Sequence, residues 1–229
     1  MKILFIITKD DEEDKYVLNL KNDHAVYIPL GIAQLSSVLE HRGHDVKIID
    51  LRLTKKIDFS KIIKQISDIN PDLIGFSISY FSKSNIISII KKIKQKSNIP
   101  VVLGGPYASI FREKLLEDCP QIDYLVYGEG ERTLIELIDA IKGKRQLKEI
   151  NGLIFKGDKS IIKNDPGKPI ENLDKLPFPA IHLFNVKRYL PHPKHYLKTP
   201  LLPVISSRGC PWGNCKFCYQ PYKFRRHSP

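Results

Sequence analysis

The first part of the chain, residues 1–145, alternates short apolar runs with amphipathic segments, and this alternation restricts the fold more than any other feature. Short, nearly continuous apolar runs are typical of parallel strands that are covered on both faces. Because an amphipathic segment separates consecutive runs, the pattern predicts an α/β fold with a doubly wound, five-stranded parallel sheet. The predicted strands are Lys2–Thr8, Asp45–Asp50, Leu73–Ser79, Pro100–Leu103 and Tyr124–Tyr127.

Apolar residues in the intervening segments recur at helical spacing, which predicts helices with one face on the sheet. Gly43, Pro71 and Gly143 follow three of these stripes and mark expected helix ends. The stripes are Ile28–Leu39, Ile62–Ile69, Ile86–Ile93, Tyr107–Leu116 and Leu134–Ile141.

After the fifth predicted helix, the alternation of strands and helices ends. Gly157 and Asp158 lie between two short apolar runs and predict a β-hairpin. Eight prolines between residues 166 and 203 predict an extended linker that lies against a neighbouring surface. Leu201–Ser206 predicts a further strand. We therefore divide the chain into an α/β domain (1–145), a hairpin and linker (146–200) and a terminal segment (201–229).

The chain is basic, with 37 lysines and arginines against 25 acidic residues and a formal net charge of +12. Most lysines lie beside isoleucines on predicted helices, which is typical of solvated helix faces, and only Lys223–His227 forms a compact basic cluster. The charge pattern therefore argues against a nucleic-acid partner. No apolar run reaches the roughly 18–20 residues of a membrane span, so we expect a cytoplasmic protein without a membrane segment.

Three of the four cysteines, Cys210, Cys215 and Cys218, lie within nine residues of one another. In a cytosolic chain, such clustering favours a metal site over disulfides. Three thiolates hold three corners of a 4Fe-4S cluster and leave one iron open for a substrate. An alternative is a zinc site completed by His227, in a zinc-stabilised nucleic-acid-binding protein.

Glycines and serines follow three of the predicted parallel strands, at the sheet edge where ligands of open α/β sheets bind. They lie in Ser77–Tyr80, Gly104–Pro106 and Gly128–Glu131. Glycines there let a bulky ligand approach the backbone, and serines offer hydrogen bonds. Ordinary turn chemistry is the alternative, with Glu129 and Glu131 favouring the start of the next helix.

The cysteine loop resembles the cluster motif of radical SAM enzymes. Phe217 matches the aromatic residue before the last cysteine, and Arg208–Pro211 matches the usual lead-in. This sequence departs from the family in having four residues, Pro211 to Asn214, between the first two cysteines instead of three. The resemblance implies that the open iron binds S-adenosyl-L-methionine (SAM) and that the reduced cluster cleaves SAM to methionine and a 5′-deoxyadenosyl radical.

The α/β domain is similar to the flavodoxin-like, cobalamin-binding domain of cobalamin-dependent radical SAM proteins, which also carry segments like Tyr27–Ile32 and His41–Val46. The resemblance implies that the loops at Thr8 and Ser77 approach the corrin. The Asp-x-His-x-x-Gly string that ligates cobalt in methionine-synthase-like domains is missing, so we expect no histidine on the lower face of cobalt. The candidate cofactor-binding residues are Thr8, Lys9, Ser77, Ile78, Ser79, Tyr80, Gly104, Gly105, Pro106, Gly128, Glu129, Gly130, Glu131 and Phe217.

The two resemblances together imply the N-terminal part of a cobalamin-dependent radical SAM enzyme of the methyltransferase class, reduced by a flavodoxin or ferredoxin. The chain ends where the radical SAM barrel would continue, so we expect a fragment, a truncated product or a half whose barrel is a separate chain. We expect no turnover by these residues alone and assign no catalytic residue. A cobalamin- or other ligand-binding module without catalysis is the alternative.

Overall fold

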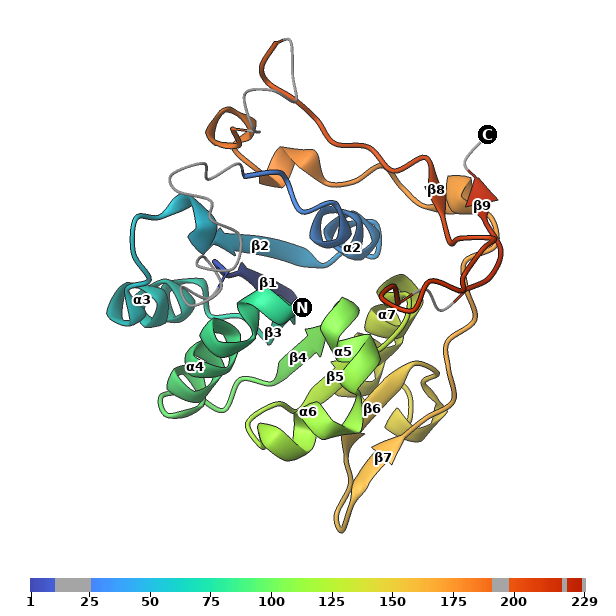
Figure 1. Ribbon diagram of the computed structural model, residues 1–229. Coiled ribbons are helices and arrows are strands. Elements are labelled where there is room, and N and C mark those ends of the chain that lie inside the picture. Colours follow the sequence, from blue (N-terminus) through green and yellow to red (C-terminus); the bar gives the residue numbers. More distant parts are fainter. Residues whose placement is uncertain (11–25, 191–197, 220–221, 228–229) are drawn as a thin grey trace.

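The computed structural model describes residues 1–10, 26–190, 198–219 and 222–227. Its centre is a seven-stranded sheet in the order β2-β1-β3-β4-β5-β6-β7 (Figure 1). Five strands run parallel, namely β1 (Lys2–Ile7), β2 (Asp45–Asp50), β3 (Leu73–Ser77), β4 (Val101–Gly104) and β5 (Tyr124–Val126). The last two, β6 (Leu153–Lys156) and β7 (Ile161–Lys163), are antiparallel. The predicted doubly wound parallel sheet is therefore confirmed.

The predicted hairpin is also confirmed, but it extends the sheet instead of forming a separate unit. In β6, Ile154 pairs with Leu125 of β5, and all of Leu153–Phe155 is buried. An unpaired β5 edge would leave backbone donors and acceptors without partners, and the hairpin satisfies them.

Two layers of helices cover the sheet, because alternate strand residues face opposite sides. Leu4 and Ile6 of β1 face one core, whereas Ile3 and Phe5 face the other. The first core is covered by α3 (Phe59–Ile69), α4 (Lys83–Lys94), α5 (Pro106–Phe111) and α6 (Glu113–Asp118). The second is covered by α2 (Leu30–Glu40) and α7 (Gly130–Ile141).

The single helix predicted over Tyr107–Leu116 is wrong, because the structure divides it into α5 and α6. Arg112 separates them with a positive φ of 45°, a conformation that no helix can continue through. The Arg112 guanidinium lies over the ring of Tyr127, 5.2 Å from its centroid, and its Nε donates to the carbonyl of Ser109. At the break, Arg112 thus makes one local contact, with Ser109, and one tertiary contact, with Tyr127.

The proline-rich segment lies against α2 and β2, which confirms the expected contact with a neighbouring surface. The amide of Ala180 donates to the carbonyl of Ala33 at 2.9 Å, and the Tyr189 hydroxyl donates to Asp50 at 2.9 Å. Phe184 and Tyr189 are buried in the second core. Three short 3-10 turns shape the segment, η5 (Leu173–Lys175), η6 (Ile181–Leu183) and η7 (Val186–Arg188).

The strand predicted over Leu201–Ser206 is wrong. Pairing begins one residue later, where β8 (Ser207–Arg208) forms a two-stranded antiparallel ribbon with β9 (Arg226–His227). Apolar sequence alone does not make a strand, because a strand needs a partner for its backbone groups. Within the described residues, none of the helices combines the length and apolar character needed to cross a membrane.

Candidate functional site

The carboxyl edge of the sheet brings three of the predicted loops together. Ser77 is level with Gly104 in the β3–β4 register, and the amide of Ile78 donates to the Gly104 carbonyl at 2.8 Å. Gly105 has a φ of 101°, and a Cβ there would lie 2.8 Å from Ser77 Oγ. The loop after β5 joins them through the amide of Gly128, which donates to Ser109 Oγ at 3.0 Å.

Thr8, directly after β1, lies at the same edge and is 6% exposed. Among the described residues its hydroxyl has no hydrogen-bond partner. A buried hydroxyl normally has one, so an orphaned hydroxyl at a sheet edge fits a polar group of a ligand. The site also lies between β1 and β3, where the strand order reverses and α/β sheets bind ligands. Lys9 is engaged otherwise, since its ammonium donates to the carbonyl of Lys55.

Aromatic side chains stand exposed beside these loops. Tyr80 is 64% exposed and meets the ring of Phe81 edge-on, with centroids 5.5 Å apart. Tyr107 stacks on the exposed Phe111 at 4.1 Å. Exposed aromatic surface on a folded domain marks a binding face. Of these residues, only Tyr80 was among the candidate cofactor-binding residues predicted from the sequence. Phe81 and Tyr107 directly follow two of the predicted loops, and this position was the signal for them.

The cysteine loop begins at Gly209, whose φ is 93° and where any Cβ would collide with the carbonyl of Phe224. The amide of Cys210 donates to the carbonyl of Tyr222 at 3.3 Å, so both ends of the loop are tied together. Cys215 and Cys218 are exposed, as is the neighbouring Phe217.

The three thiols share the loop but do not converge. Among the described residues, no three His, Cys, Asp or Glu side chains are grouped closely enough to hold a metal ion. The cluster at Cys210, Cys215 and Cys218 therefore stays a prediction. Backbone amides of Gly213 and Trp212, with a smaller effect from Arg225, hold the pKa of the Cys210 thiol below its ordinary value. The thiolate is the form that binds metal, so the loop favours ligation at this position.

The carboxylates of Glu129 and Glu131 contact arginines on both sides of the cysteine loop. Glu129 accepts from Arg226 at 2.7 and 2.9 Å, and Glu131 accepts from Arg208 at 2.7 Å. Burial acts to raise the pKa of Glu129, but hydrogen bonds from Arg226 and the Ile170 amide outweigh it, and the pKa lies below its ordinary value. Sequence reasoning missed these contacts, and a cofactor contact at either glutamate stays a prediction.

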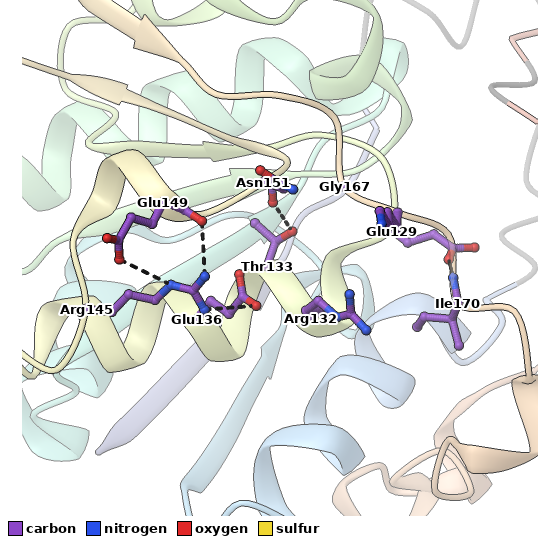
Figure 2. A pocket seen from close by; sticks show the side chains of 10 residues that line it. Glu129, Arg132, Thr133, Glu136, Arg145, Glu149, Asn151, Gly167 and Ile170 are labelled. Carbon is purple, nitrogen blue, oxygen red and sulfur yellow. Dashed lines mark hydrogen bonds and ion pairs between the residues drawn. The ribbon is translucent and has the colours of Figure 1, made fainter.

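A cavity of about 260 Å³ lies beside α7 (Figure 2). Arg145 lines one side of it and pairs with Glu136 at 3.1 Å, and Thr133 donates to the carbonyl of Asn151. The volume is below the roughly 300–1,000 Å³ of cofactor pockets, and none of the loops around Thr8 and Ser77 lines it. This cavity is therefore too small to be the site of a large cofactor.

Comparison with known proteins identifies relatives of this chain. The sequence model of the B12 binding domain matches residues 16–138. An uncharacterized methyltransferase of Pyrococcus horikoshii is 36% identical over 234 residues, which cover 100% of this chain and 48% of that protein. The chain thus spans about half the length of this curated relative.

Two solved structures share the fold. The cobalamin-dependent S-adenosylmethionine radical enzyme OxsB, with aqua-cobalamin and S-adenosylmethionine bound, superimposes with a TM-score of 0.77 at 22% identity, over 99% of this chain and 30% of that one. The radical S-adenosylmethionine methyltransferase TsrM of Kitasatospora setae, with cobalamin and a 4Fe-4S cluster bound, gives a TM-score of 0.60 at 21% identity, over 81% and 34%.

Proposed function

The chain belongs to the B12-binding domain family, and from that premise we propose that it is the cobalamin-binding and cluster-binding part of a radical SAM enzyme. One observation carries the proposal. The three-cysteine loop is bonded through Arg208 and Arg226 to the Gly128–Glu131 loop, at the sheet edge where we expect the corrin. A cluster on this loop and a cobalamin on this edge would therefore be neighbours.

The residues present fit a corrin at the carboxyl edge. The buried hydroxyl of Thr8, without a partner among the described residues, and the exposed Ser77 offer polar contacts, while Tyr80, Phe81 and Phe111 offer exposed aromatic surface. A corrin is a broad ring with an apolar face and a polar rim, and a site for it needs both kinds of group.

Cys210, Cys215 and Cys218 would hold three irons of a 4Fe-4S cluster and leave the fourth for SAM. When bound, these cofactors supply one-electron cleavage of SAM and a cobalt that carries a methyl group. The electron would come from a flavodoxin or ferredoxin. Because two of the relatives described above are named methyltransferases, we propose methyl transfer as the reaction class, with the rest of the enzyme supplying the substrate site.

A second candidate is a cobalamin-binding module without catalysis of its own. The observation in its favour is that the three thiols do not converge on a common point in the described part of the chain. The two candidates differ in whether the loop takes up iron.

Anaerobic reconstitution with iron and sulfide tests the cluster. We expect a brown protein with broad visible absorbance, and we expect Cys215→Ala to lose it. Cys119→Ala is the matched control, because Cys119 is a thiol buried in the first core and its loss should leave iron uptake unchanged. Zinc uptake at one equivalent without any iron uptake would exclude the cluster and favour the binding module.

Titration with hydroxocobalamin tests the corrin site separately. Binding should shift the corrin spectrum, and Cys215→Ala should bind as tightly as the wild type. A spectrum that stays unchanged at high cobalamin concentration would remove cobalamin from the proposal.

A further inference from the structure

Two arginines stand opposite each other at the base of the cysteine loop. Arg208 of β8 and Arg226 of β9 are direct partners in the ribbon. Opposite residues of an antiparallel pair project to the same face, and like charges in that position repel. The ribbon therefore needs counter-charges on this face.

Glu129 and Glu131 supply these counter-charges from the α/β domain. Glu129 lies between the arginines, 2.7 Å from Arg226 Nη2 and 3.5 Å from Arg208 Nη1. Glu131 accepts from Arg208 at 2.7 Å. We call these four residues the loop anchor.

The loop anchor is shielded from water, and the charges of its four side chains sum to zero. Glu131 and Arg226 are only 6% and 7% exposed. Two negative charges face two positive ones, so removal of any one leaves a buried charge without compensation. Such a group holds one geometry more firmly than an exposed ion pair does.

A third segment is fixed by the same side chains. The amide of Ile170 donates to Glu129 Oε2 at 2.7 Å, and its carbonyl accepts from Arg226 Nη1 at 2.8 Å. Figure 2 shows Glu129 reaching Ile170. The rings of Tyr222 and Phe224 lie 5.0 and 5.7 Å from the Arg226 guanidinium. The start of the proline-rich segment and both strands of the ribbon therefore meet at one point.

The thiols lie between the two arginines along the chain, since Arg208 just precedes Cys210 and Arg226 follows Cys218. We propose that the loop anchor sets the position of the cysteine loop on the carboxyl edge of the sheet, so that Glu129, Glu131, Arg208 and Arg226 are positioning residues. The consequence for the cofactors, a fixed separation of cluster and corrin, rests on the proposed function. The anchoring of the loop itself does not.

Hydrogen exchange on the full, unloaded chain tests the anchor. Glu129→Gln keeps the shape of the side chain and removes its charge. We expect exchange of the Cys210 amide and of other amides in residues 207–219 and 222–227 to accelerate about ten- to one-hundred-fold, the range expected for loss of a charged hydrogen bond. Amides of β3 and β4 should keep their rates. Asp118→Asn is the matched control, because it breaks an exposed carboxylate–ammonium pair with Lys114.

Trp212, the only tryptophan of the chain, lies in the cysteine loop and gives a second readout. Glu129→Gln should lower the fluorescence anisotropy of Trp212, and Asp118→Asn should not. Arg226→Lys keeps the charge but loses the two-pronged contact, so its exchange rates should fall between those of the wild type and of Glu129→Gln.

Unchanged exchange of residues 207–219 and 222–227 in both Glu129→Gln and Arg226→Lys would overturn the proposal. An equal acceleration in β3 and β4 would also overturn it, because it would show that the four residues serve only general stability. Failure to bind iron or cobalamin would remove the proposed function and leave this result intact, since the measurement uses the unloaded chain. If the cluster does load, Glu129→Gln should change its electron paramagnetic resonance signal upon SAM addition while iron content stays equal.

Discussion

Glu129 and Arg226 form a two-pronged ion pair, with distances of 2.7 and 2.9 Å, although 97 residues separate them in the chain. The pair joins the start of α7 to the last strand of the terminal ribbon (Figure 1). It thereby connects the part of the chain that matches the B12 binding domain with the part that carries the cysteines.

The first prediction concerns the stability of this pair and its pH dependence. At pH 7, Glu129→Gln should lower the free energy of local opening of the terminal ribbon by about 1.5–3 kcal/mol, the usual value of a hydrogen bond to a charged group, while the opening of β3 and β4 stays unchanged. Because the folded-state pKa of Glu129 is below its ordinary value of 4.5, the carboxylate stabilises the fold fully above that pH. This contribution disappears as the pH falls through the lowered pKa. Hydrogen exchange of the ribbon amides in both proteins between neutral and acidic pH should show the difference in opening free energy closing, and a constant difference would contradict the assignment.

The second prediction concerns Thr8, whose buried hydroxyl has no partner in the described residues. Thr8→Val has nearly the same shape and removes the unsatisfied group. Without cobalamin, the variant should be more stable than the wild type by about 1–3 kcal/mol, the desolvation cost of an unmade hydrogen bond. Its affinity for hydroxocobalamin should be lower. Unfolding and spectral titration measure the two effects, and equal cobalamin affinity would show that the hydroxyl serves no ligand.

The third prediction concerns Gly105, where the β3 and β4 loops meet. An added Cβ would lie 2.8 Å from Ser77 Oγ and 2.9 Å from the Ile78 carbonyl, at a φ of 101°. Gly105→Ala should therefore destabilise the protein by about 1–3 kcal/mol. Gly31→Ala is the control, because its site on α2 has open space and alanine favours helix. That variant should be more stable by about 0.5–1 kcal/mol, and thermal unfolding distinguishes the two.

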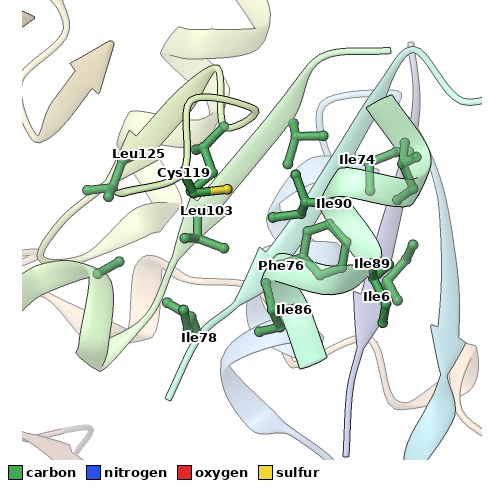
Figure 3. Close-up of a cluster of buried hydrophobic side chains, with 14 of the residues drawn as sticks. Ile6, Ile74, Phe76, Ile78, Ile86, Ile89, Ile90, Leu103, Cys119 and Leu125 are labelled. Atoms are coloured by element: carbon green, nitrogen blue, oxygen red, sulfur yellow. The ribbon is translucent and has the colours of Figure 1, made fainter. Parts of the chain in front are cut away.

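The fourth prediction concerns the core beneath α4 (Figure 3). Ile90 is fully buried there. Ile90→Ala should cost about 2–5 kcal/mol, since it leaves a cavity, whereas Ile90→Val should cost about 0.5–1.5 kcal/mol. Chemical denaturation measures both values. Equal costs would indicate that the helix moves inward to fill the space.

The sequence by itself determined the elements that depend on local pattern. Alternation within Lys2–Ile7 places Ile3 and Leu4 on opposite faces of β1, and helical spacing identifies the buried side of α4, including Ile86 and Ile93. Both patterns arise from fixed backbone geometry, so they can be read from neighbouring residues. The spacing of Cys210, Cys215 and Cys218 identified the candidate cluster loop in the same way.

The tertiary structure alone decided how distant segments meet. The charge of Glu129 was visible in the sequence, but its pairing with Arg226 depends on where the ribbon lies relative to α7. Arg112, at the break between α5 and α6, meets the ring of Tyr127, and the edge position of the hairpin depends on the free side of β5. Each of these follows from contacts between residues that are remote in the chain, and local propensity carries no information about such contacts.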